Sequence, residues 1–305
     1  MPRRKSKGRA LTGLLLFDKT SGESSNHALQ KVKRLFNAAK AGHTGTLDPL
    51  ATGLLVICFG RATKISNYFL TADKQYQVTL KLGETTTSGD ADGDVLEQKD
   101  FVKLSQAHIQ QAALKLTGEI EQVPPMYSAL KHQGKRLYEL ARKGEEVERK
   151  IRKVNVHEFK FICQREDLVT MHVHCSKGTY VRTLVEDLGN LLNCGAHVVQ
   201  LRRTSIGPFT QPNMYTLRDL EALVMEDLAS LDALLLPVES ALQHWPKIHV
   251  TQQQIQDIQH GRPINLPELD KDTSARIYDA ENQFYGMANF NEKGKIAIKC
   301  LNKSV

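Results

Sequence analysis

Apolar residues along the chain fall into short runs and helical spacings that follow each other in irregular order. The runs at 11–17 and 54–60 are typical of buried strands, and residues 75–82 alternate as a half-buried strand does. Residues 25–37 and 105–116 carry apolar side chains at helical spacing. Helices and alternating strands in this order predict an α+β domain with a mainly antiparallel, mixed central sheet flanked by helices.

A second, smaller pattern of helix and strands lies at the C-terminal end of the chain. Residues 252–260 have helical spacing, and short strand patterns follow at 276–279, 284–288 and 295–299. Their spacing is that of a small β-barrel, which is too short to be stable alone. We therefore predict a basic tail at 1–10, a large domain at 11–250 and a small C-terminal domain at 251–305.

Positive charge gathers in an insertion at 124–153. Nine lysines and arginines lie between Lys131 and Lys153, against four glutamates. Leu137, Leu140 and Ala141 have helical spacing, which favours a short amphipathic helix between hinges at Gly134 and Gly144. A solvated surface hairpin remains an alternative for the same segment.

Overall composition narrows the class of protein. The chain has 41 Lys+Arg against 34 Asp+Glu, a net charge of +7, and its tail adds Arg3, Arg4, Lys5, Lys7 and Arg9. This favours a polyanionic partner such as a nucleic acid. No stretch approaches the roughly 20 apolar residues that span a bilayer. Five cysteines without a Cys-x-x-Cys pair argue against disulfides and structural zinc, and indicate a reducing cytoplasm.

One carboxylate lies in a loop dense with glycine, threonine and proline. Asp48 belongs to the run Gly-His-Thr-Gly-Thr-Leu-Asp-Pro-Leu-Ala-Thr-Gly at 42–53. Glycine permits unusual dihedrals and Pro49 fixes its own, so the loop can hold a side chain rigidly beside the strand that follows. Asp48 is therefore the first candidate for chemistry, with an ordinary Asp-Pro turn as the alternative.

Two other patterns resemble metal sites. Residues 90–94 imitate a calcium loop, but glycine stands at the fourth place and Phe101 at the twelfth, so we expect a plain loop. His172 and His174 share one face of a predicted strand and Cys175 follows them. No partner pair at ligand spacing accompanies them, so we interpret them as ordinary strand residues.

The loop around Asp48 and its continuation at 61–64 resemble the catalytic motif of the TruB family, the bacterial tRNA pseudouridine-55 synthases. The resemblance extends to residues 19–22, Tyr76, 177–184 and 201–204. It implies a pseudouridine-synthase catalytic domain at 11–250, a thumb-like insertion that closes over RNA, and a PUA-like RNA-binding barrel at 251–305. It also implies an isomerase of uridine 55 in the T loop of tRNA, acting in the cytoplasm as a monomer without metal, cofactor, membrane or obligate protein partner.

Pseudouridine formation breaks and re-forms a glycosidic bond, which requires a carboxylate. Asp48 fits this role, whether it attacks C1′, attacks C6 or deprotonates the sugar. Burial would raise the pKa of Asp48 unless a cation lies close, and Arg182 is the matching cation. A surface or phosphate-binding role for Arg182 is the alternative.

The target base must leave its stack, and an aromatic ring compensates with roughly 1–3 kcal/mol per base. Tyr76 is the predicted stacking residue, with removal of the C5 proton as a second possible role. By resemblance, Tyr180 and Leu201 contact the base and His43 packs into the RNA loop; ordinary core or turn roles are their alternatives. We expect Tyr180 to share a face with Arg182 if that segment is extended.

Further basic residues match positions that contact the RNA backbone or support structure: Lys19, Lys64, Arg202, Arg203 and, in the insertion, Lys131. Three other functions remain open at this point. They are a tRNA-folding factor for which catalysis is secondary, a pseudouridine synthase with a different RNA target, and a metal-dependent nuclease, against which the missing ligand cluster argues.

Overall fold

The computed structural model describes residues 8–100, 104–264, 266, 273–290 and 296–300. Most of the predicted basic tail lies outside these residues, so its first seven positions stay untested. Arg9 is described, and its side chain pairs with the carboxylate of Asp232.

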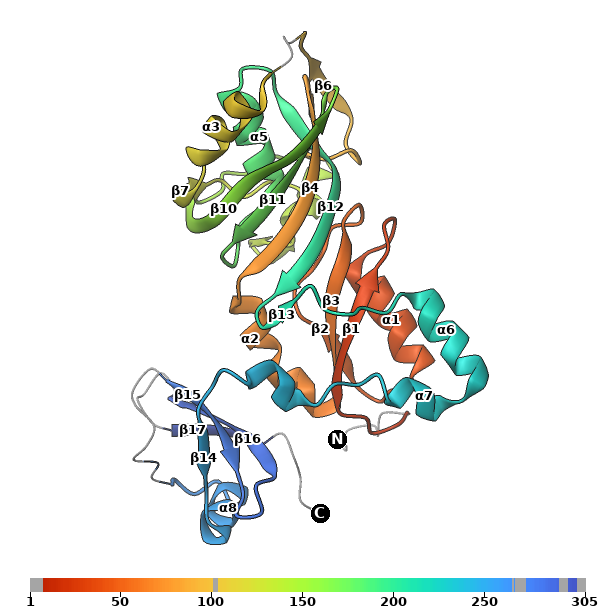
Figure 1. The fold of residues 1–305 in the computed structure, drawn as a ribbon, viewed down its shortest axis with the longest axis vertical. Helices are drawn as coiled ribbons and strands as arrows, with labels where there is room; N and C mark the ends of the chain where they lie inside the picture. The colour runs from red at the N-terminus through yellow and green to blue at the C-terminus, as the bar shows by residue number, and fades with distance from the viewer. Residues whose placement is uncertain (1–7, 101–103, 265, 267–272, 291–295, 301–305) are drawn as a thin grey trace.

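A large mixed sheet forms the body of the molecule (Figure 1). Its strands run in the order β1-β3-β12-β4-β11-β10-β7, with β2 added beside β3 and β13 beside β12. Among the described strands of this large sheet, only the β3–β12 pair is parallel; the other pairs in it are antiparallel, as the sequence predicted. The strands are β1 (Gly13–Lys19), β2 (Ala41–His43), β3 (Thr52–Phe59), β4 (Lys74–Leu82), β7 (Gly118–Gln122), β10 (Arg152–Arg165), β11 (Leu168–Cys175), β12 (Ala196–Ile206) and β13 (Phe209–Thr210).

Helices cover the sheet in two groups. Helices α3 and α5 lie on the half formed by β4, β10, β11 and β12, whereas α1, α6 and α7 gather beside β1 and β2 (Figure 1). The helical segments are α1 (Ser25–Leu35), η1 (Gly60–Ile65), α2 (Ser66–Thr71), α3 (Gln106–Leu114), α5 (Val181–Leu191), α6 (Leu217–Glu226), α7 (Leu228–Asp232) and η2 (Val238–Leu242). In the part of the chain that the structure describes, no helix is long and apolar enough to cross a membrane.

The predicted local elements form for identifiable reasons. Ser24 and Ser105 begin helices α1 and α3 by accepting the backbone N–H groups of His27 and His108. From Gly53 to Phe59, strand β3 is buried on both faces, because the core packs against each side of the sheet. Residues 90–94 form a loop between two short strands, β5 (Glu84–Thr86) and β6 (Val95–Gln98).

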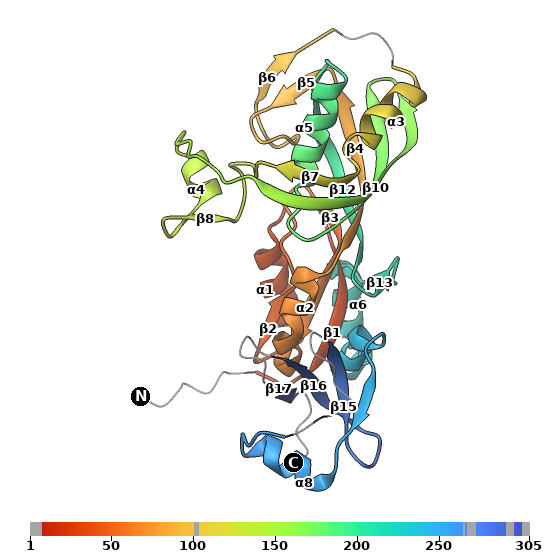
Figure 2. The same ribbon diagram turned by 90° about the vertical axis from the view of Figure 1, so that its left-hand side faces the viewer.

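The basic insertion stands out to one side of the sheet (Figure 2). It contains a hairpin of β8 (Lys131–His132) and β9 (Lys135–Arg136), followed directly by helix α4 (Leu137–Ala141). The segment therefore contains both structures considered for it, first the hairpin and then the short helix. Gly134 has φ +86° at the hairpin turn, a conformation that favours glycine.

The C-terminal unit is a sheet of β14 (Lys247–His249), β15 (Ser274–Tyr278), β16 (Phe284–Phe290) and β17 (Ile296–Cys300), with helix α8 (Gln252–Gln259). Strand β14 belongs to this sheet, so the unit begins before the predicted boundary at residue 251. Closure into a barrel stays a prediction. Met287 packs in a core cluster with α2 and η2, which seats the small unit on the large domain.

Candidate active site

Asp48 lies in the loop between β2 and β3, and hydrogen bonds to buried side chains hold this loop in place. The hydroxyl of Ser25 donates to the Leu47 carbonyl (3.0 Å) and accepts the Leu47 N–H (2.8 Å). The Ala51 N–H donates to the Asp48 carbonyl (3.1 Å) and closes a turn. Polar groups of the loop backbone are thus satisfied by fixed partners, as a rigid site requires.

Lys19 is the central support of the loop. Its side chain is fully buried, and Nζ donates to the carbonyls of Thr20 (2.8 Å), Pro49 (3.2 Å) and Ala51 (2.7 Å). Burial lowers the pKa of Lys19 to about 8, although the charges of Glu23 and Asp48 oppose this shift. A buried ammonium in this position holds the segment that follows Asp48.

Arg203 joins the two ends of the same loop. Its Nε donates to the Leu54 carbonyl (2.7 Å) and its Nη2 to the Gly45 carbonyl (3.2 Å). Gly53 has φ +95°, and a Cβ there would collide with the Arg203 carbonyl. Glycine is therefore required where β3 meets β12.

For Lys19 and Arg203, the sequence left two roles open, contact with the RNA backbone and support of the structure, and their positions favour the second. Lys19 and Arg203 are 0% and 1% exposed, so neither can contact RNA in this structure. Both act on the Asp48 loop instead. Position in a motif does not reveal whether a basic side chain points outward or inward.

Arg182, in the first turn of α5, faces Asp48 across the site. Its Nε lies 3.0 Å from Asp48 Oδ2, and its side chain is 5% exposed, against 38% for Asp48. The remaining nitrogens are fixed as well: Nη1 donates to the Ser88 carbonyl (2.8 Å) and Nη2 to the Tyr127 carbonyl (2.6 Å). The guanidinium is held on several sides and presents one N–H to the carboxylate.

The environment of Asp48 sets its acidity. Burial raises the pKa of Asp48 above its ordinary value, the charge of Arg182 and its hydrogen bond oppose that rise, and Asp90 adds to it. The carboxylate is consequently a poorly solvated anion beside a permanent cation, with its outer part still accessible. Such a group can attack or stabilise a positive centre brought to it.

Asp90 is a site residue that the sequence reasoning missed. It is 4% exposed, and its Oδ2 lies 3.5 Å from Nη1 of Arg182. Ser88 Oγ and the Asp92 N–H donate to its other oxygen. In the sequence, residues 90–94 only resembled an incomplete calcium loop. Asp90 can act as a counter-ion of Arg182 because helix α5 packs against this loop, and the sequence does not show that packing.

Three of the predicted base-contacting residues lie on strands of the large sheet. Tyr76 is on β4, opposite Arg203 of β12. Burial raises the pKa of Tyr76, Arg203 opposes the rise, and the charge of Asp48 adds to it. Leu201 is buried on β12, and His43 ends β2 with a buried Nδ1 that has no hydrogen-bond partner.

Tyr180 reaches the site in a different way from the one expected. It directly precedes helix α5, so Arg182 is helical and the two residues do not share a face of an extended segment. The Gln122 side chain makes hydrogen bonds to both backbone groups of Tyr180. Its Oε1 accepts from the Tyr180 N–H (3.0 Å), and its Nε2 donates to the Tyr180 carbonyl (3.3 Å). Burial raises the pKa of Tyr180, which also responds to the charges of Asp48 and Arg182.

The other predicted basic residues lie toward the surface. Lys64 in η1 and Lys131 in β8 are exposed. Arg202 makes a two-point ion pair with Asp18, at 2.9 and 2.6 Å. Of the predicted RNA-contacting set, Lys64 and Lys131 are thus the side chains best placed to meet phosphates.

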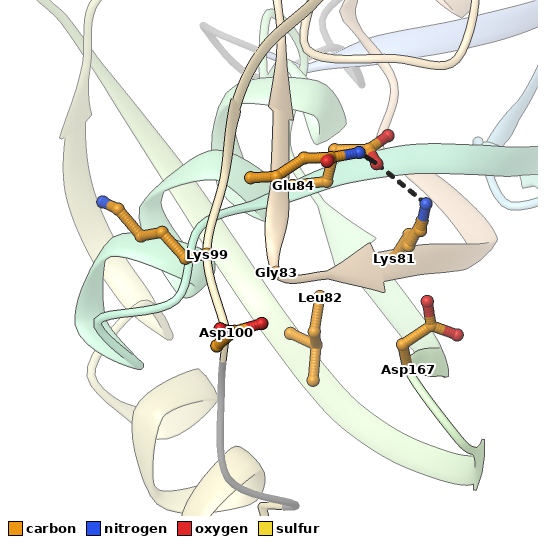
Figure 3. Close-up of a pocket in the computed structure, with 8 residues that line it drawn as sticks. Lys81, Leu82, Gly83, Glu84, Lys99, Asp100 and Asp167 are labelled. Carbon is orange, nitrogen blue, oxygen red and sulfur yellow. Dashed lines mark hydrogen bonds and ion pairs between the residues drawn. The ribbon is translucent and has the colours of Figure 1, made fainter.

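A cavity of about 310 Å³ lies elsewhere, at the end of β4 beside β5 and β6 (Figure 3). It is lined by Lys81, Leu82, Gly83, Glu84, Gln98, Lys99, Asp100 and Asp167. None of the predicted site residues lines it. The candidate active site is therefore the surface at Asp48 rather than this cavity.

Family models match most of the chain. They are "TruB family pseudouridylate synthase (N terminal domain)" at residues 33–181, "tRNA pseudouridylate synthase B C-terminal domain" at 182–243 and "Pseudouridine synthase II TruB, C-terminal" at 246–301. The chain is 49% identical to tRNA pseudouridine synthase B of Stutzerimonas stutzeri over 297 residues, 97% of each chain. The chain belongs to the TruB family of pseudouridylate synthases. It is thus a pseudouridine synthase, an isomerase.

Other members of the TruB family are similarly close. tRNA pseudouridine synthase B of Pseudomonas aeruginosa is 48% identical over 97% of each chain, and that of Nitrosococcus oceani is 46% identical over 98% of this chain and 97% of the other. Among solved structures, a Cbf5-Nop10-Gar1 complex has a chain with TM-score 0.73 and 25% identity, covering 96% of this chain and 84% of that one. The pseudouridine-synthase fold is therefore shared with these structures.

Proposed function

We propose that this protein converts the uridine at position 55, in the T loop of tRNA, to pseudouridine. The names of its TruB-family relatives support a tRNA substrate, and the resemblance of residues 42–53 to the family motif supports the position. The observation that carries the proposal is the contact between Arg182 Nε and Asp48 Oδ2 at 3.0 Å, in a loop fixed from below. A carboxylate held in this way is the group that glycosidic-bond chemistry needs.

Each residue of the proposed site has its own role in the reaction or in binding the base. Asp48 supplies the carboxylate for breaking and re-forming the bond between base and ribose. Arg182 keeps that carboxylate oriented and ionised. Tyr76 stacks on the extruded uracil, and this contact offsets the few kcal/mol that base flipping costs. Tyr180 and Leu201 enclose the base, and His43 fills space in the opened RNA loop.

The exposed insertion is the proposed RNA clasp. Its helix α4 presents Tyr138 between the guanidiniums of Arg136 and Arg142, at 5.8 and 5.6 Å from the ring centre. Lys131, Lys135 and Lys143 are exposed around it. Since the Tyr127 carbonyl accepts from Arg182, the base of the insertion is joined directly to the catalytic pair.

The remaining expectations complete the proposal. We place the enzyme in the cytoplasm, where tRNA is modified, and expect a monomer that binds one tRNA through shape and backbone contacts. Gel filtration of the protein with and without tRNA tests this stoichiometry. A dimer in the absence of RNA would contradict it.

The function is tested on two tRNA transcripts that differ only in carrying U or C at position 55. Pseudouridine is mapped by base-specific chemical modification and primer extension. The proposal predicts one new pseudouridine, at position 55, and none in the transcript with C55. Modification at another uridine of either transcript would show a different target.

The clasp is tested separately by the salt dependence of tRNA binding. Lys131→Gln should weaken binding and reduce the slope of log affinity against log salt by about one. Lys115→Gln removes an equally exposed lysine at the end of α3 and should leave the slope unchanged. Equal effects of both substitutions would contradict a specific contact at Lys131.

A further inference from the structure

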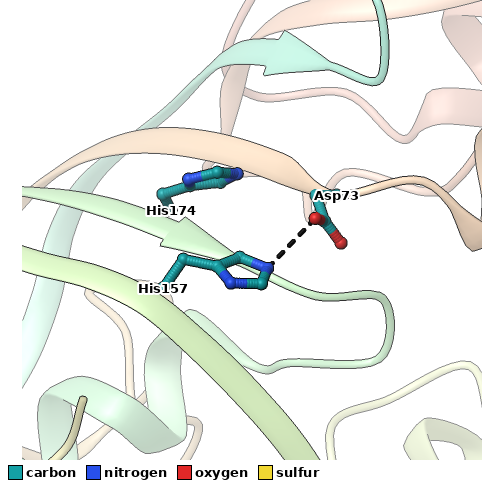
Figure 4. A group of neighbouring side chains, drawn as sticks. All are labelled: Asp73, His157 and His174. Carbon is teal, nitrogen blue, oxygen red and sulfur yellow. Dashed lines mark ion pairs between the residues drawn. The ribbon is translucent and has the colours of Figure 1, made fainter. Parts of the chain in front are cut away.

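Three side chains suited to binding a metal ion meet on the large sheet. They are Asp73, His157 and His174, and one ligand atom from each lies within 4.8 Å of the other two (Figure 4). The group contains none of the residues around Asp48. It forms the one cluster of this kind among the described residues.

Adjacent strands bring the three together from distant parts of the sequence. His174 is on β11, opposite Gln75 of β4, and Asp73 directly precedes β4. His157 is at an irregularity in β10, because Val156 pairs with Cys175 and Glu158 pairs with His174. The extra residue of such a bulge is free to be turned toward a neighbour, here toward Asp73.

The cluster lies on the other face of the sheet from the stacking tyrosine. Val173 is paired with Tyr76, and its neighbour His174 therefore points to the opposite face. Asp73 shares that face with Gln75 for the same reason. An ion held here would not touch the uracil at Tyr76.

The distances fit a small divalent ion. Tetrahedral zinc with bonds of 2.0–2.1 Å to nitrogen or oxygen requires donor atoms about 3.4 Å apart. His157 Nε2 and Asp73 Oδ2 are already 3.0 Å apart, and the two imidazole rings have centroids 4.6 Å apart.

Accessibility and charge favour binding as well. The Asp73 side chain is 48% exposed and that of His157 34%, so an ion can enter and keep a water ligand. The nearby Lys74 directs its ammonium away, to the carbonyls of Phe69, Leu70 and Ala72.

We propose that Asp73, His157 and His174 form a site for a divalent ion of the zinc class, which links β10, β11 and the start of β4. Two imidazoles and one carboxylate are a ligand set that such ions prefer over magnesium or calcium. The ion stabilises the sheet beneath the active site and takes no part in the isomerisation. The sequence analysis interpreted His174, together with His172 and Cys175, as an ordinary strand residue and did not consider Asp73 or His157.

Titration calorimetry of tag-free, chelator-treated protein with zinc chloride tests the site. We expect one ion per chain, and at least tenfold weaker binding in His157→Ala, His174→Ala and Asp73→Asn. His172→Ala is the matched control: His172 lies on the same face of β11 but pairs with Glu158 at 3.1 Å. Its zinc affinity should equal that of the wild type.

Two results would overturn the proposal: no stoichiometric binding by the wild type, or an affinity unchanged by His174→Ala. A loss in His172→Ala as large as in His174→Ala would also contradict the ligand set. Circular dichroism verifies that each variant is folded. Should a variant fail to fold, anomalous scattering at the zinc edge from wild-type crystals locates the ion, and a peak away from Asp73 and His174 refutes the site.

Discussion

Arg182 directs its Nε at Asp48 Oδ2, 3.0 Å away, while its two terminal nitrogens donate to the carbonyls of Ser88 and Tyr127. The arginine therefore does more than supply a charge. It connects the Asp48 carboxylate with the acidic loop on one side and with the base of the insertion on the other. A side chain with a single nitrogen cannot make these contacts together.

The first prediction follows from this geometry. Arg182→Lys keeps the positive charge but loses the planar fork, so Asp48 is no longer held in position. We expect kcat to fall at least about 100-fold, the size of loss that a small misplacement causes. Single-turnover assays on tRNA measure it. Arg218→Lys, at an exposed position of α6, is the control and should keep the wild-type rate, and a rate for Arg182→Lys within threefold of wild type would contradict the positioning role.

Asp90 provides the second prediction. Asp90→Asn removes the charge that faces Nη1 of Arg182 but preserves shape, so the guanidinium should become less firmly oriented. We expect kcat to fall about tenfold with KM unchanged, since loss of a hydrogen bond to a charged group costs about 1.5–3 kcal/mol and this contact is long. Asp92→Asn in the same loop is exposed and should match wild type. A change confined to KM would instead indicate that Asp90 affects RNA binding.

The third prediction separates a structural lysine from an RNA-binding one. Lys19→Met removes the Nζ donor from three carbonyls. The Pro49 carbonyl keeps the Gly22 N–H, but those of Thr20 and Ala51 lose the donor that Lys19 gave them, and each unsatisfied buried group costs about 1–3 kcal/mol. Thermal unfolding should shift to clearly lower temperature, and kcat should fall with it. Lys40→Met, at an exposed position, should change neither. An unchanged melting temperature with weaker tRNA binding would show that Lys19 contacts RNA.

The fourth prediction concerns stability and pH. Because burial raises the folded-state pKa of Asp48, the ionised carboxylate disfavours the folded state at neutral pH. Asp48→Asn should therefore raise the melting temperature at pH 7. The gain should shrink as the pH falls through the raised folded-state pKa, and vanish well below the ordinary value of about 3.9, where wild-type Asp48 is protonated in both states. Melting curves at pH 7 and below 4 measure this.

The control for the fourth prediction is Asp94→Asn, an exposed residue of the acidic loop. It should leave the melting temperature unchanged at both pH values. A lower melting temperature for Asp48→Asn at pH 7 would mean that Arg182 outweighs burial. The ionised Asp48 carboxylate would then not destabilise the folded state.

Much of the fold follows from local pattern. The buried strand at 54–60 and the helices at 25–37 and 105–116 formed near their predicted bounds, because uninterrupted apolar runs and serine caps are local signals. The order of strands in the sheet is not local, and neither is the start of the C-terminal unit. Strand β14 is three residues long and pairs with β15, which follows a long connection.

The site was predictable where chemistry demanded a partner. A buried carboxylate needs a cation, and the resemblance of residues 177–184 to the family singled out Arg182 as that cation for Asp48. It gave no reason to link Asp90 with Arg182, whose contact depends on packing of a loop against α5. Lys19 was assigned to RNA because charge indicates the surface on average, whereas here three carbonyls keep it inside. Asp73, His157 and His174 escaped notice because only the sheet brings them together.

The central claim is that Asp48, held by Arg182, carries out the isomerisation. Its most direct test compares the wild-type protein with Asp48→Asn on an unmodified tRNA transcript, without added cofactor, measuring both tRNA binding and pseudouridine at position 55. The account predicts equal binding by the two proteins, with conversion by the wild type alone. Pseudouridine formed by Asp48→Asn, or none formed by the wild type despite binding, would contradict it.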